Sequence, residues 1–220
     1  KRKIGQTKIR SYSTLIIMKK NFKNIKIFGD IMLDQWISGN LNRISPEAPV
    51  SILESKNYYH NLGGAGNVAV NLDSLKVPLK LYGSVGNDFE EKIIKNLLKK
   101  KKIKNLLKLT PKCTTLKTRL TTDKGKHIIR IDKEEEFNKE FFSSIYKNIK
   151  KKDLVIISDY KKGIINNNTV KNILKKNKMI LIDPKNHYKY YKNAFLVKPN
   201  MYEFLNWVKS KKFKWTDAFL

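Results

Sequence analysis

Short apolar runs alternate with longer amphipathic segments along most of this chain. Five runs are short and bounded by polar or glycine residues, which is typical of buried strands: 25–29, 79–83, 154–158, 179–182 and 195–197. Between them, apolar residues recur at helical spacing in five segments: 67–75, 88–101, 139–150, 166–176 and 200–208. Strands alternating with helices predict an α/β fold, with a largely parallel sheet flanked by helices.

Two pairs of extended segments fall outside this alternation. Residues 36–38 pair in character with 50–55, and 116–120 with 127–131. The second pair is joined by a polar stretch containing Asp123 and Gly125, which favours a hairpin. These segments are either edge strands of a single sheet or a small separate sheet.

The run 92–109 alternates lysine pairs with isoleucine and leucine. A basic amphipathic helix of this kind lies either on a membrane surface or against the sheet of its own protein. The second arrangement is much commoner, so we predict one surface helix here and no membrane partner.

The charge of the chain invites a nucleic-acid function, but the kind of basic residue argues against it. The formal net charge is +28, with 47 Lys and Arg against 19 Asp and Glu. Only five of the 47 are Arg, and they are scattered along the chain. Arg is the residue best suited to forming two hydrogen bonds at once with a base edge or a phosphate. We therefore expect no specific nucleic-acid partner. The single cysteine excludes a disulfide within the chain.

The first residues of the chain are basic and lack acidic side chains. Their composition resembles a targeting peptide, but the apolar stretch is too short for a secretory signal. We interpret residues 1–24 as an extension outside the fold, with Met18 as an alternative start. Residues 25–208 are predicted to form the domain, and 209–220 a tail.

The most informative stretch is Gly63-Gly64-Ala65-Gly66-Asn67, which opens an apolar helical run. Glycines allow the backbone to approach a ligand, and a helix N-terminus presents free N–H groups and a positive dipole end. A tight turn without a ligand is the alternative. Asp34 follows the first strand, where open α/β sheets bind ligands, and its carboxylate suits sugar hydroxyls, as does the amide of Asn67. A turn or cap role for Asp34 is the plainer alternative.

Six motifs in order resemble the ribokinase-like (PfkB) carbohydrate kinases. They are Gly-Asp-Ile-Met-Leu-Asp at 29–34, Arg-Ile-Ser-Pro-Glu-Ala-Pro-Val at 43–50, the glycine-rich stretch at 63–67, Asp-Tyr-Lys-Lys-Gly at 159–163, Asp-Pro-Lys at 183–185, and Lys-Pro-Asn-Met-Tyr-Glu at 198–203. The first two look most like the heptose-7-phosphate kinase domain of the bifunctional heptose kinase/adenylyltransferases. The resemblance implies a ribokinase-like fold whose extra strands form a small β lid over the sugar.

The resemblance also implies the chemistry: transfer of the ATP γ-phosphoryl group to a hydroxyl of a sugar phosphate, D-glycero-D-manno-heptose 7-phosphate, in ADP-heptose and lipopolysaccharide precursor synthesis. The family's Gly-Ala-Gly-Asp segment with its catalytic aspartate is not found in these 220 residues. We expect it beyond Leu220, with the C-terminal part of the fold, and we expect no sugar-dependent ATP turnover from this stretch alone. A catalytically inactive sugar-phosphate-binding protein is the alternative.

The implied site residues form two sets. For the sugar phosphate they are Asp34, Gly63, Gly64, Asn67, Arg119, Arg130 and Asp159. For the nucleotide and Mg²⁺ they are Lys185, Asn200 and Glu203, with Glu203 as the metal ligand. Plainer alternatives remain for several: a surface salt bridge to Asp132 or Glu134 for each arginine, an exposed lysine at 185, and a helix cap for the Asn200–Glu203 pair. The expected partners are ATP, the sugar phosphate and a second copy bound through the lid, in the cytoplasm.

Overall fold

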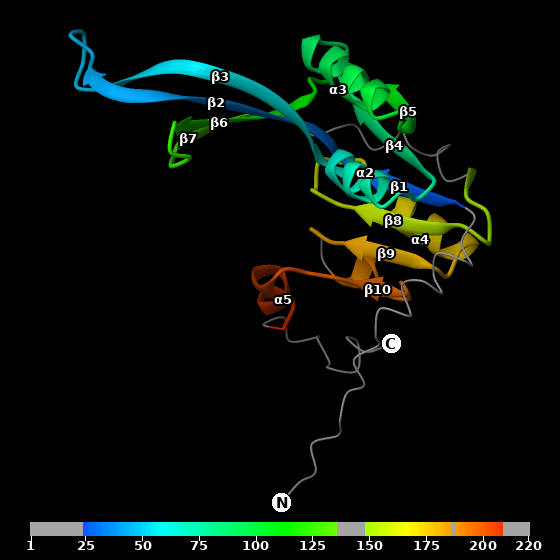
Figure 1. Cartoon of the computed structure of the whole chain (residues 1–220). Coiled ribbons are helices and arrows are strands. Elements are labelled where there is room, and N and C mark those ends of the chain that lie inside the picture. Colours follow the sequence, from blue (N-terminus) through cyan, green and yellow to red (C-terminus); the bar gives the residue numbers. More distant parts are fainter. Residues whose placement is uncertain (1–23, 136–147, 186–187, 209–220) are drawn as a thin grey trace, which may run out of the picture.

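The central element of the fold is a six-stranded parallel sheet. The computed structural model describes residues 24–135, 148–185 and 188–208. In spatial order the strands are β10 (Leu196–Val197), β9 (Ile180–Asp183), β8 (Leu154–Ser158), β1 (Ile25–Gly29), β4 (Leu79–Val85) and β5 (Lys104–Leu109), every neighbouring pair parallel (Figure 1). The predicted α/β architecture is confirmed.

Helices cover both faces of this sheet. Alternate side chains of a strand point to opposite faces, so Ile27 and Phe28 enter different cores. Ile27 packs in the core that includes residues of α2 (Ala65–Ser74) and α3 (Phe89–Lys100), and Phe28 in the core that includes α4 (Asn167–Lys176). The short helix η3 (Tyr188–Tyr190) contacts α4, and α5 (Met201–Val208) follows β10 in the chain. Among the described residues, no helix is both long and apolar enough to cross a membrane.

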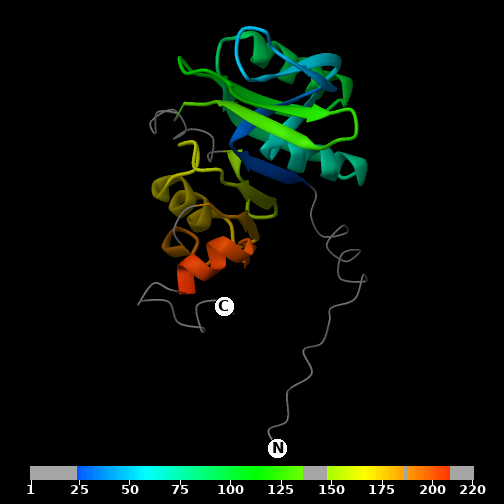
Figure 2. The ribbon, with the colours of Figure 1, turned by 90° about the vertical axis from the view of Figure 1, so that its left-hand side faces the viewer.

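A second sheet of four strands projects from one side of the first (Figures 1 and 2). Its order is β3 (Ser51–Gly64), β2 (Ile31–Ile44), β6 (Thr115–Thr122) and β7 (His127–Lys133). Strands β2 and β6 are parallel, and the outer pairs are antiparallel. We call this sheet the lid. The predicted extended segments were right in place but too short, because pairing between strands carries β2 and β3 through polar residues that the pattern alone does not support.

The prediction of one helix over 92–109 is wrong. Helix α3 ends at Lys100, and residues 104–109 form the edge strand β5. The helix is closed by bonds from the N–H of Lys102 to the Lys99 carbonyl and from Ile103 to the Leu98 carbonyl, with Lys102 in the left-handed region at φ 54°. This is a common way for a helix to stop, but it usually uses glycine, so a lysine at this position does not mark the end; the shorter predicted segment, 88–101, is the one confirmed. Most of the predicted helix 139–150 lies outside the described residues.

Candidate functional site

Asp30 joins the two sheets at the carboxyl edge of the parallel strands. It is the single residue between β1 and β2, and its side chain is buried. Its Oδ2 accepts hydrogen bonds from the N–H groups of Tyr160 (2.7 Å) and Lys162 (3.3 Å), while Oδ1 is buried without a partner. Burial raises the pKa of Asp30 to about 7, against the two hydrogen bonds and with help from Asp159. Asp30 therefore holds the loop after β8 against the start of the lid.

Asp34 lies on the lid strand β2 and is paired with Arg119 of β6. The Arg119 guanidinium donates to Asp34 Oδ1 at 2.6 Å, and both side chains are about one fifth exposed. The same guanidinium lies over the ring of Trp36, 5.0 Å from its centroid. The Asp34 carboxylate and the Trp36 ring together fix the position of the Arg119 guanidinium. The exposed parts of Asp34 and Arg119 lie next to each other, where one ligand could contact both.

Gly63 and Gly64 end strand β3, and α2 begins at the next residue. The prediction of a glycine-rich loop was wrong in form, because no loop separates strand and helix. A Cβ at position 64 would lie 2.3 Å from the Asp30 carbonyl oxygen, and Gly64 has φ +56°. Only glycine fits there without strain. The amide of Ala65 then donates to that same carbonyl at 2.9 Å, which fixes where the helix starts.

The N-terminus of α2 has no side-chain cap and no acidic residue in its first turn, and its first two residues, Ala65 and Gly66, are buried. Asn67, the third residue of the helix, is exposed. Apart from the Ala65 amide, which donates to Asp30, the N–H groups of the first turn and the positive dipole end are features that suit a hydroxyl-rich or anionic ligand; that such a ligand binds here stays a prediction.

A second cluster lies at the other end of the same edge, between β9 and α5. Lys185 Nζ contacts Glu203 Oε1 at 2.9 Å. Glu203 Oε2 accepts from the Asn200 N–H, and Asn200 Oδ1 accepts from the Glu203 N–H, each at 2.9 Å. The capping arrangement left open by the sequence is therefore present, and it also aims one oxygen of Glu203 at Lys185.

Asp183 is the residue beside this cluster that the sequence analysis left out of the site. It ends β9 and is half-buried. Burial raises its pKa, and the Glu203 carboxylate acts in the same direction while Lys198 opposes it. Two carboxylates that repel one another, beside a lysine, fit Mg²⁺ in its usual protein setting of one or two carboxylates completed by substrate phosphates. Within the described parts of the chain no group of three or more metal-ligating side chains occurs.

Tyr160 is within electrostatic reach of Asp34 on the lid and of the Lys185–Glu203 cluster. Burial raises the pKa of its phenol, and the carboxylates of Asp183 and Asp34 add to the shift while Lys185 opposes it. One ring thus feels charges from both groups, although it is still over a third exposed. The motif 159–163 pointed to this turn, but only the folded arrangement brings Tyr160 within electrostatic reach of both groups.

Asp159 and Arg130 both have partners within the chain. Asp159 is buried; its Oδ1 accepts from the Lys161 N–H at 2.7 Å and its Oδ2 from the Tyr191 hydroxyl at 2.5 Å. These two hydrogen bonds fix the turn after β8 and tie it to Tyr191. Arg130 stands opposite Arg119 across β6 and β7, but its guanidinium binds Asp132 at 2.8 and 3.0 Å, which is the surface salt bridge that the sequence left open.

The comparisons with known proteins point to one family. Residues 23–218 match the family described as pfkB family carbohydrate kinase. The bifunctional protein HldE of Helicobacter pylori (strain G27) is 41% identical over 194 residues, which are 82% of this chain and 42% of that protein. HldE of Haemophilus influenzae is 37% identical over 193 residues, 83% and 40% of the two chains. The chain thus spans about two fifths of the length of these relatives.

Solved structures show the same fold at low identity. The tetrameric inhibited form of phosphofructokinase-2 from Escherichia coli superposes with a TM-score of 0.69 at 16% identity, covering 89% of this chain and 67% of that one. Ribokinase from Giardia lamblia gives 0.62 at 16% identity, covering 86% and 62%. The similarity supports a ribokinase-like fold for the described part of the chain.

Proposed function

Because this chain belongs to the pfkB family of carbohydrate kinases, we propose that it serves the transfer of the ATP γ-phosphoryl group to a hydroxyl of D-glycero-D-manno-heptose 7-phosphate, a step toward ADP-heptose and lipopolysaccharide. The observation that carries the proposal is the pairing of Asp34 with Arg119 beside the uncapped N-terminus of α2. The HldE relatives, about 40% identical, support the heptose substrate.

The sugar subsite is built from the lid and α2. Asp34 accepts hydrogen bonds from sugar hydroxyls, and Asn67 both donates and accepts. Arg119 is the group for the phosphate of the substrate, since a guanidinium binds phosphate oxygens in pairs. The proximity of Arg130 to Arg119 in the strand register lets it add charge if it leaves Asp132. Gly63, Gly64 and Asp159 act by shaping the backbone around these groups.

The nucleotide subsite is the cluster of Lys185, Asn200 and Glu203 with Asp183. Glu203 and Asp183 would hold Mg²⁺, which supplies charge neutralisation of the ATP phosphates. Lys185 is placed to contact a phosphate oxygen, and its ion pair with Glu203 keeps the lysine extended across the edge of the sheet. Phosphoryl transfer of this kind depends mainly on positioning and charge, with a carboxylate accepting the hydroxyl proton. The prediction that this carboxylate lies beyond Leu220 stays a prediction.

The outer face of the lid suits a second copy of the chain. Tyr58, Ile37, Leu120 and Ile129 are register neighbours across all four strands and share the face opposite Asp34. Tyr58 is 59% exposed and Ile129 54%. We infer a homodimer through this apolar row, as the sequence analysis expected. Ile129→Glu should shift the protein toward monomer in sedimentation; an unchanged mass would contradict the inferred contact.

Calorimetry with the 220-residue protein tests the substrate. We expect heptose 7-phosphate to bind more tightly than the unphosphorylated heptose and than fructose 6-phosphate. Arg119→Gln should reduce the difference in affinity between the phosphorylated and the unphosphorylated sugar. Asp34→Ala should weaken the binding of both sugars by about 1–3 kcal/mol. Asp123→Ala, on the hairpin of the lid, is the matched control. Equal affinity for all three sugars, or full binding by Asp34→Ala, would count against the proposal.

A further inference from the structure

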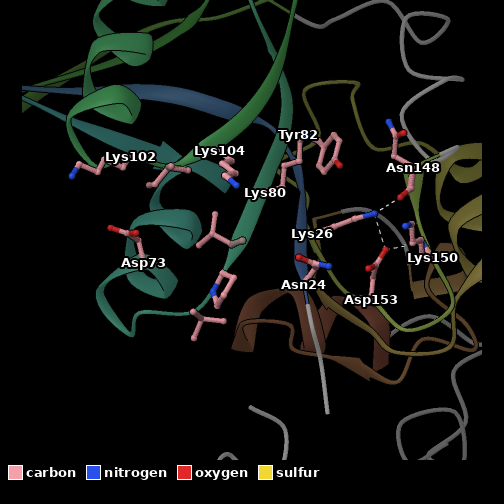
Figure 3. A pocket seen from close by; sticks show the side chains of 14 residues that line it. Asn24, Lys26, Asp73, Lys80, Tyr82, Lys102, Lys104, Asn148, Lys150 and Asp153 are labelled. Carbon is pink, nitrogen blue, oxygen red and sulfur yellow. Dashed lines mark hydrogen bonds and ion pairs between the residues drawn. The ribbon is translucent and has the colours of Figure 1, made fainter. Parts of the chain in front are cut away.

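A hollow of about 480 Å³ opens at the edge of the six-stranded sheet opposite to the candidate site, where β1, β4 and β5 begin (Figure 3). In Figure 3, Lys80, Lys102 and Lys104 lie on one side of it with Asp73, and Lys26, Lys150 and Asp153 lie on the other. The proposed function uses none of these residues.

Three of the lysines form a row across adjacent strands. Lys26 of β1 is the register neighbour of Lys80 of β4, and Lys80 is the neighbour of Lys104 of β5. Register neighbours in a parallel sheet point to the same face, about 5 Å apart from strand to strand. Lysine is common throughout this chain, so its number alone means little. A row of three lysines on neighbouring parallel strands is different, because such strands are ordinarily apolar.

Only one member of the row is neutralised. Lys26 is buried and forms an ion pair with Asp153 at 2.7 Å, and it also donates to the Asn148 carbonyl. Lys80, Lys102, Lys104 and Lys150 make no ion pair with any residue of the described ranges. Asp73 is the other carboxylate that lines the hollow. Like charges on neighbouring strands repel, so the lysines destabilise one another, and an anion among them would relieve that repulsion.

We propose that this hollow is a binding site for a small phosphorylated molecule with two or more negative charges. Ammonium groups on flexible stems serve phosphate as point charges, and the volume falls in the range of small-molecule sites, roughly 300–1,000 Å³. The buried Lys26–Asp153 pair forms the floor and holds one end of the row in place. The hollow and the sugar subsite lie at opposite ends of the same strands and do not overlap. The protein can therefore hold both ligands at the same time.

Titration calorimetry with inorganic pyrophosphate tests the site, at about 150 mM salt to suppress diffuse binding. We expect one pyrophosphate per chain. Lys80→Gln with Lys104→Gln should weaken it by about tenfold or more. Lys171→Gln with Lys175→Gln, two exposed lysines on α4, removes the same charge elsewhere and should leave the affinity within about twofold. Asp34→Ala should also bind pyrophosphate normally.

A second pair of variants separates charge from folding. Lys102 and Lys76 both close a helix at positive φ, 54° and 55°, where glycine is more favourable. Lys102→Gly and Lys76→Gly therefore make the same backbone change without destabilising the protein, but only Lys102 lines the hollow. Lys102→Gly should lower the affinity and Lys76→Gly should not. Equal losses in the two, full binding by the double glutamine variant, or no saturable binding by the unaltered protein would overturn the proposal.

Discussion

Gly63 leaves room for the carboxylate of Asp34. A Cβ at position 63 would lie 2.6 Å from Asp34 Oδ2 and equally close to the Met32 side chain. Met32 and Gly63 are register partners, and Asp34 is two residues further along the same face of β2. Position 63 therefore needs glycine because the Met32 and Asp34 side chains of β2 occupy the space of a Cβ. This reason is independent of any ligand that approaches the backbone.

Gly63→Ala should lower the affinity for the sugar phosphate nearly as much as Asp34→Ala. The methyl group displaces the carboxylate from Arg119, so the loss should be about 1–3 kcal/mol. Calorimetry checks the affinity, and urea unfolding checks that the variant is folded. A folded Gly63→Ala protein with unchanged affinity would show that Asp34 does not bind the sugar from its present position.

Asn67→Ala should weaken sugar binding by about 1–2 kcal/mol, because a hydrogen-bonding amide in the first turn of α2 is lost. Asn71→Ala offers the matched control: it is the same substitution at an exposed position one turn further along α2. Both changes leave the overall charge unaltered. If the two variants bind equally well, Asn67 is a surface residue and the glycine-rich helix start has only a structural role.

Asn200→Ala should lower the free energy of unfolding by about 1 kcal/mol. The side chain of Asn200 accepts from the Glu203 N–H, and Glu203 accepts in return from the Asn200 N–H, so the change breaks one bond of a reciprocal pair at the start of α5. Asn206→Ala, exposed on the same helix, should be neutral or slightly stabilising. Urea unfolding of both variants measures the difference. Equal stabilities would contradict the capping role.

Asp30→Asn should change how stability depends on pH. The pKa of Asp30 is raised from 3.8 to about 7 in the folded protein, mainly by burial. Between these values the folded protein holds a proton that the unfolded chain has lost, so the contribution of Asp30 to stability falls as the pH rises through this window and is constant above it. The total fall is on the order of 4 kcal/mol.

Asparagine resembles the protonated acid and removes this slope. Measured against the unaltered protein, Asp30→Asn should therefore gain relative stability between pH 5 and about pH 7 and no more above that. The comparison cancels other titrating groups, among them Asp88 and Asp132, whose pKa values are lowered by hydrogen bonds and nearby cations against the effect of burial. A difference between the two proteins that does not change with pH would contradict the assignment.

Much of the fold could be predicted because its central strands are short, mostly apolar runs. Leu154–Ser158, for example, is apolar on both faces, as a strand buried in a parallel sheet must be, and it is too short for an ordinary helix. The edge strand β5 was missed for the opposite reason. Its leucines are mixed with lysines that face solvent, so it continues the spacing of α3 without a break. Only the positive φ of Lys102 separates the two elements.

The site could be predicted in part. Asn200 and Glu203 follow β10 at the edge where parallel sheets bind ligands, so their positions were predictable. Asp34 was expected just past the first strand, but it lies within the lid strand β2. The partners of these side chains were not predictable. The bond from Arg119 to Asp34 joins residues 85 positions apart, and it depends on β6 lying beside β2. Tyr160 likewise comes within electrostatic reach of Asp34 and of Asp183 only in the folded chain.

Two connections between the lid and the rest of the fold lie side by side: Asp30, between β1 and β2, and the passage from β3 directly into α2. The hydrogen bond from the Ala65 amide to the Asp30 carbonyl joins them. Any rotation of the lid about this joint must lengthen that bond. The rate at which the Ala65 amide hydrogen exchanges with deuterium therefore measures how often the lid rotates far enough to break this bond. Protection of this one amide should rise when a sugar phosphate holds the lid in place, and remain unchanged when pyrophosphate binds at the far edge.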